Sequence, residues 1–147
     1  MLIHNTLNDI DFTEIERKCN VNYQEPDKII NIPTKTINKI NDTKKIIIKS
    51  GEKILGTITN EKSINDIIET ITTSVQYSYK DTDVAYLCDG YSFEFNLFNN
   101  KDKLIDTIYV WHSGTRLIPK SIHSGCSYFN TTSSKDLRKI IENETNY

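Results

Sequence analysis

A repeated tripeptide marks the segment of this 147-residue sequence in which ligand-binding side chains are concentrated. His-Ser-Gly occurs at residues 112–114 and again at residues 123–125. Imidazole can donate, accept or transfer a proton near neutral pH, glycine permits close backbone approach, and arginine bonds phosphate or carboxylate with two parallel donors. We therefore predict a loop that binds a small anionic ligand. The candidate ligand-binding residues are Trp111, His112, Ser113, Gly114, Arg116, Lys120, His123, Ser124 and Gly125.

The same residues also have a purely structural interpretation. Each tripeptide can end one strand and begin the next, with glycine at positive φ and serine bonded to the backbone. Trp111, with Tyr109 two residues earlier on the same face, fits a sheet core as well as a stacking platform. Arg116 has the alternative of a salt bridge to Asp89 or Asp106, worth only about 0–1 kcal/mol if exposed. If Arg116 binds the ligand instead, Arg116→Ala is expected to keep the melting temperature and abolish binding.

No complete catalytic or metal-binding motif is present in the sequence. A metal bound by His112 and His123 would need a third ligand, and the nearest candidates, Cys126 and Asp89, match no zinc spacing. Phosphate-loop, dinucleotide-binding and RNA-binding signatures are also missing. We therefore expect no metal, no cofactor and no assigned catalytic residue. The enzymatic alternative is a small phosphodiester hydrolase with His112 or His123 as general acid–base.

The amino-acid composition argues against several classes of protein and partner. The net charge is −2 and Lys and Glu are mixed along the chain, which favours neither nucleic acid nor a membrane as partner. Three cysteines without close pairs argue against a disulfide framework, and apolar runs such as 46–48 are far below the roughly 20 residues of a membrane span. The first residues lack the features of a secretory signal. We expect a cytoplasmic protein, and the scarcity of Ala and Arg beside many Ile, Asn and Lys indicates an AT-rich bacterium or its phage.

The remaining chain is expected to form a single domain, 1–147. Residues 1–43 are predicted to be an irregular N-terminal wrap with a short helix at 11–19 and room for one edge strand, and residues 44–147 a sheet with two helices. Helical periodicity and caps predict helices at 60–73 and 133–143. Period-two alternation predicts an α+β fold with an antiparallel sheet of about four to six strands, the two main amphipathic helices covering one face. The strand-like runs are 44–49, 53–58, 75–79, 84–88, 91–97, 104–111 and 126–129.

The order of these elements resembles small uncharacterised α+β domains common in Firmicutes. The resemblance covers about residues 44–143 and rests on the capped Ile-rich helix, the strand alternating Tyr and Phe, the strand Lys-Leu-Ile-Asp-Thr-Ile-Tyr-Val-Trp, and the final Ser-capped helix. It implies a fold and no activity.

The functional expectation is a non-catalytic binding protein that neutralises another molecule, either an immunity-type inhibitor of a toxin or a phage-encoded antagonist of host defence. Small size, the missing active-site motifs and many Tyr and Asn residues favour recognition over catalysis. The sequence leaves two classes of ligand open. A phosphorylated signal, such as a nucleotide, would use Arg116, Lys120 and the backbone amides of Gly114 and Gly125, whereas a protein would use a Tyr/Trp patch outside the loop. A structural or assembly role is the third alternative, and the oligomeric state is open.

Overall fold

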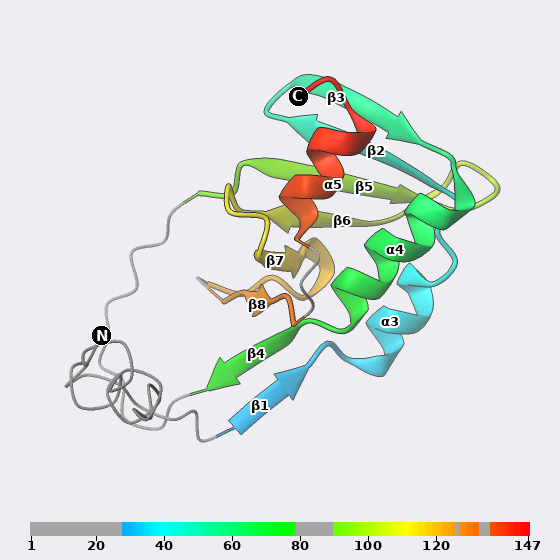
Figure 1. The fold of residues 1–147 in the computed structure, drawn as a ribbon. Coiled ribbons are helices and arrows are strands. Elements are labelled where there is room, and N and C mark those ends of the chain that lie inside the picture. Colours follow the sequence, from blue (N-terminus) through cyan, green and yellow to red (C-terminus); the bar gives the residue numbers. More distant parts are fainter. Residues whose placement is uncertain (1–27, 79–89, 126, 133–135) are drawn as a thin grey trace, which may run out of the picture.

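The computed structural model describes residues 28–78, 90–125, 127–132 and 136–147. These residues form an α+β fold in which one antiparallel sheet carries its α-helices on one side (Figure 1). The sheet has eight strands in the order β1-β4-β8-β7-β6-β5-β2-β3. The strands are β1 (Lys28–Asn31), β2 (Lys45–Ser50), β3 (Lys53–Ile58), β4 (Val75–Ser78), β5 (Phe93–Phe98), β6 (Leu104–Val110), β7 (Arg116–Pro119) and β8 (Phe129–Asn130). The helices are α3 (Thr34–Ile40), α4 (Glu61–Thr72), α5 (Leu137–Glu144) and the 3-10 helix η1 (Lys120–Ile122).

The expected sheet of four to six strands is therefore wrong, because the sheet has eight. Strand β7 was not expected, and its four residues are too few for period-two alternation to reveal. Strand β7 lies inside the segment that was expected to be a ligand loop. It is a strand because β6 and β8 pair with it on both sides. Pairing with neighbouring strands can thus produce a strand that the local sequence does not predict.

Two further expectations about helices need correction. The segment 1–43 was expected to be irregular apart from a short helix at 11–19 and one edge strand, but it also contains α3, in addition to the two expected main helices. The closing helix begins at Leu137, where the Asp136 side chain accepts a hydrogen bond from the Lys139 amide at 2.7 Å. The expected cap at Ser133, the expected helix at 11–19 and the expected strand at 84–88 lie outside the described residues.

Helix α4 forms where its cap and periodicity predict it. The Asn60 side chain accepts a hydrogen bond from the Ser63 amide at 3.0 Å, which satisfies one of the unpaired donors of the first turn. Behind this cap, the isoleucines at helical spacing are buried: Ile64, Ile67, Ile68 and Ile71. Isoleucine is a mediocre helix former, so burial of this stripe against the sheet holds the helix.

Alternation in the central strands separates the two faces of the sheet. Phe93 and Phe95 of β5 lie in register with Val110 and Ile108 of β6, and all four are at most 1% exposed. They belong to one core cluster with the isoleucines of α4 and α5, on what we call the first face. Residues between them, such as Tyr109, point to the opposite side, called here the second face. The arrangement thus assigns each residue of the central strands to one face.

Candidate functional site

The predicted site residues divide between the two faces of the sheet. Trp111 follows β6 directly, and its amide donates to the carbonyl of Arg116 at the start of β7 at 3.0 Å. Leu117 is buried on the first face, in register with Val110, so its neighbour Arg116 lies on the second face with Trp111. The connection between them, 112–115, instead contacts helix α5. The segment is therefore not one loop around one ligand.

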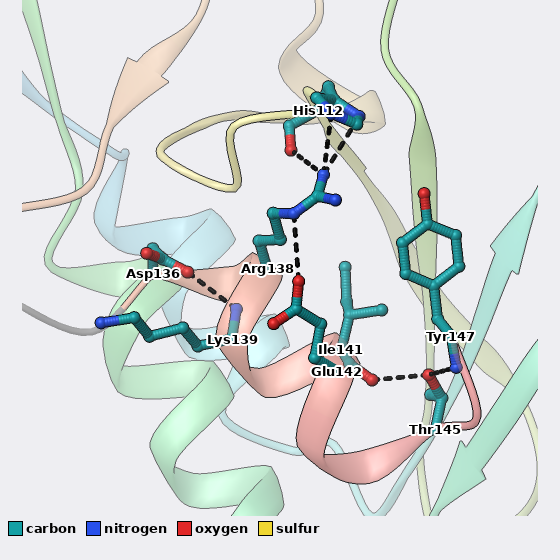
Figure 2. Close-up of polar contacts among 8 residues, drawn as sticks. All are labelled: His112, Asp136, Arg138, Lys139, Ile141, Glu142, Thr145 and Tyr147. Carbon is teal, nitrogen blue, oxygen red and sulfur yellow. Dashed lines mark hydrogen bonds and ion pairs between the residues drawn. The ribbon is translucent and has the colours of Figure 1, made fainter.

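His112 is held by an arginine of α5. Nη1 of Arg138 lies 2.9 Å from Nε2 and 3.1 Å from Nδ1 of His112, and it donates to the His112 carbonyl at 3.0 Å (Figure 2). Nε of Arg138 pairs with the Glu142 carboxylate at 3.2 Å. Arg138 thus joins the first turn of α5 to the β6–β7 connection. A position on a helix surface indicates only a solvated arginine, so this contact could not be predicted from the sequence.

Gly114 completes the contact between the connection and α5. Its amide donates to the Trp111 carbonyl at 2.9 Å, and its carbonyl accepts from the Leu137 amide at 3.0 Å. A Cβ at this position would lie 2.3 Å from the backbone nitrogen of Arg138, and φ is +77°. Glycine is therefore required here for packing. Because the Gly114 amide is already used, it is not available for the phosphate cradle considered from the sequence.

On the second face, the structure gathers six side chains into what we call the aromatic patch: Tyr91, Tyr109, Trp111, Arg116, His123 and Tyr128. The rings of Tyr91 and Tyr109 stack with centroids 4.1 Å apart and an angle of 15°. The His123 ring meets the Tyr109 ring edge-on at 5.8 Å. Trp111 and Tyr128 are tilted against one another at 5.9 Å. Tyr109, Trp111 and Tyr128 are half-buried, so the core and platform interpretations of Trp111 both describe part of its surface.

Arg116 lies on this patch without a carboxylate partner among the described residues. Its guanidinium carbon is 4.9 Å from the centre of the Tyr128 ring, within the range of a cation–π contact. Asp106, one of the acidic partners considered from the sequence, instead accepts hydrogen bonds from the Thr107 amide and from the amide and hydroxyl of Ser121. The other candidate, Asp89, lies outside the described residues. The Arg116 side chain is thus exposed and lies against the Tyr128 ring, and it has no ion pair in the described structure.

The remaining predicted residues have local turn roles or lie exposed at the surface. The Ser113 hydroxyl is 2.9 Å from that of Thr115, and the Lys120 carbonyl accepts from the His123 amide at 3.2 Å. The Ser124 carbonyl accepts from the hydroxyl of Ser127 at 2.7 Å, and Gly125 has φ +58°. The ring of His123 contacts Tyr109, whereas that of His112 contacts Arg138, so the two imidazoles have different neighbours.

Tyr91, Tyr128 and Asn130 are surface residues that the sequence did not single out for binding. A usable signal existed for two of them, because Tyr128 and Asn130 flank the buried Phe129 and so must face away from the core. Tyr91 precedes β5, and its hydroxyl donates to the Glu94 carboxylate at 3.2 Å. Partial burial, and then this hydrogen bond, raise the pKa of the Tyr91 phenol above its usual 10.0.

A cavity also lies on the helical side of the molecule. Its volume is about 330 Å³, and it lies between α3 and α4, lined by Asn41, Thr43, Asn65, Ile68, Glu69 and Thr72. The hydroxyls of Thr43 and Thr72 already donate to helix carbonyls, at 2.7 and 2.9 Å. The lining therefore offers few groups with which to orient a ligand. The described residues include no cluster of three or more metal-ligating side chains.

Comparison with protein-family models, curated proteins and solved structures found no match for this chain. Within the described residues, no helix has the length and apolar character needed to span a bilayer.

Proposed function

We propose that this chain is a non-catalytic, cytoplasmic binding protein that recognises another protein through the aromatic patch and thereby neutralises it. The observation that carries the proposal is the gathering of four aromatic side chains and Arg116 on one sheet face. Tyr, Trp and Arg are the residue types that dominate the binding energy of protein interfaces. Their rings supply large contact areas at low entropic cost.

The contacts favour a protein partner over a small phosphorylated signal. A phosphate site needs several donors that converge on one point. Here the Gly114 amide is used within the fold, and Arg116 lies on a face that Gly114 does not share, since Gly114 packs against α5. A paired-histidine hydrolase is favoured still less, because His112 and His123 contact different elements. A toxin or a host defence factor remains the kind of partner that we propose.

Capture of the partner tests this function. The purified chain is immobilised, and a lysate of cells that carry its gene is passed over it. A specific protein should be retained by the wild type and by Lys62→Ala, which alters an exposed residue of α4 on the helical side. Tyr91→Ala and Arg116→Ala should lose that protein, while their melting temperatures stay within a few degrees of the wild type because both side chains are exposed.

Neutralisation is then measured by expressing the captured protein with and without this chain. Growth inhibition or defence activity should appear only in the absence of the chain. Equal retention by Tyr91→Ala, Arg116→Ala and the wild type would refute the aromatic patch as the binding surface. A captured protein whose activity is unchanged by the chain would refute neutralisation.

A further inference from the structure

Arg116 has an amide neighbour on the same face. Its Cα lies in register with that of Asn130 across the β7–β8 pair, so both side chains project from the second face, with Cβ atoms roughly 5 Å apart. Asn130 in turn lies in register with Val75 of β4. In the part of the chain that the structure describes, neither the guanidinium of Arg116 nor the carboxamide of Asn130 makes a hydrogen bond. Two sets of donors therefore lie side by side.

Lysines elsewhere in the sheet lie beside acidic side chains, and the contrast with this pair points to an anionic partner. Lys45 of β2 forms an ion pair with Asp102 at 2.7 Å. Lys49 lies in register with Glu94, so these opposite charges are cross-strand neighbours. Arg116 of β7, in contrast, lies opposite Asn130 of β8 on one side and opposite Trp111, directly after β6, on the other, and neither is acidic. Among the described residues, Arg116 therefore has no acidic partner that compensates its charge.

The shape of the site favours a carboxylate over a phosphate. The guanidinium carbon of Arg116 lies over the Tyr128 ring, and a cation–π contact uses none of the N–H donors of the guanidinium. A planar carboxylate can accept two parallel bonds from these donors and a further one from a carboxamide. Trp111 lies directly across from Arg116 and can pack against an apolar side chain beside the carboxylate. Neighbouring side chains thus suit an acidic residue flanked by an apolar one.

We propose that Arg116 and Asn130 bind the carboxylate of an acidic, apolar-flanked segment of the protein partner. This inference rests on the proposed function and specifies its ligand chemistry. Trp111, the single tryptophan of the chain, lies beside the carboxylate position, so its fluorescence reports occupancy of this site.

The test uses two synthetic peptides, acetyl-Gly-Ser-Glu-Phe-Glu-Ser-Gly-amide and its analogue with both Glu replaced by Gln. Titration with the Glu peptide should give a saturable change in Trp111 emission, and the Gln peptide should bind at least about tenfold more weakly. Arg116→Gln should lose about tenfold or more in affinity for the Glu peptide, and Asn130→Ala several-fold. Arg116→Lys should recover only part of the affinity, because an ammonium lacks the planar fork. Lys49→Gln is the matched control that removes a positive charge from the same face and should keep wild-type affinity.

Equal affinity for the two peptides, an unchanged Arg116→Gln variant, or no binding of the Glu peptide to the wild type would each overturn the carboxylate site. Inorganic phosphate and a ten-nucleotide oligothymidylate serve as competing anions, and tighter binding of either one would show that the site is built for phosphate. The proposed function is decided separately by the capture experiment. Retention of a partner that depends on Tyr91 but not on Arg116 would keep the function and exclude this anchor.

Discussion

Gly114→Ala should be among the most damaging single-methyl additions in this chain. The backbone there has φ +77°, and a non-glycine residue in that region costs about 1–2 kcal/mol. The added Cβ would also lie 2.3 Å from the Arg138 nitrogen, so the start of α5 must shift. Overpacking of this kind costs about 1–3 kcal/mol. Together the two effects predict a loss of about 2–5 kcal/mol in the free energy of unfolding.

Gly125→Ala provides the matched control. Its φ is +58°, but no atom lies within 4 Å of the added Cβ, so only the backbone cost of about 1–2 kcal/mol applies. Urea unfolding followed by circular dichroism gives both free energies by linear extrapolation. Relative to the wild type, Gly114→Ala should also accelerate amide hydrogen exchange more in α5 than in α4, because the contact is local. Gly125→Ala should show no such difference between the two helices. If Gly114→Ala costs no more than Gly125→Ala, the packing of the connection against α5 is refuted.

Three other predictions concern polar contacts. Ser121→Ala removes the hydroxyl donor of the buried Asp106 carboxylate and should cost about 1–3 kcal/mol in urea unfolding, so wild-type stability would contradict the contact. Asn60→Ala removes the cap of α4 and should cost about 0.5–2 kcal/mol, whereas Asn60→Asp should retain most of the stability. Because the pKa of the Tyr91 phenol is raised in the folded state, this phenol ionises at lower pH in the unfolded chain. Its contribution to the free energy of unfolding is therefore complete below pH 10 and is lost as the pH rises through the higher folded-state pKa. Tyr91→Phe should flatten the alkaline part of the stability–pH curve, and an identical slope in both proteins would exclude this linkage.

The sequence by itself determined the elements whose signal is local and repeated. Helix α4 lies where its cap and four isoleucines placed it, and the alternation in β5 and β6 assigned Tyr109 and Trp111 to the face opposite Ile108 and Val110. These features follow from periods of 3.6 and 2 residues, which any chain folded as helix or strand must obey. The Asn99–Asp102 turn is another local feature, and Asp102 adopts the positive φ of a tight connection.

Tertiary structure alone decided the number of strands and the division of the predicted site. Strand β7 forms because β6 and β8 pair with it, and no pattern in its four residues predicts that pairing. The His-Ser-Gly repeat looked like one site because its residues are close in sequence. In the fold, Gly114 lies in the 112–115 connection and packs against α5, whereas Arg116 begins β7 and lies in the aromatic patch. Contacts such as Arg138 with His112 and Arg116 with Asn130 join residues far apart along the chain, and only the assembled sheet brings them together.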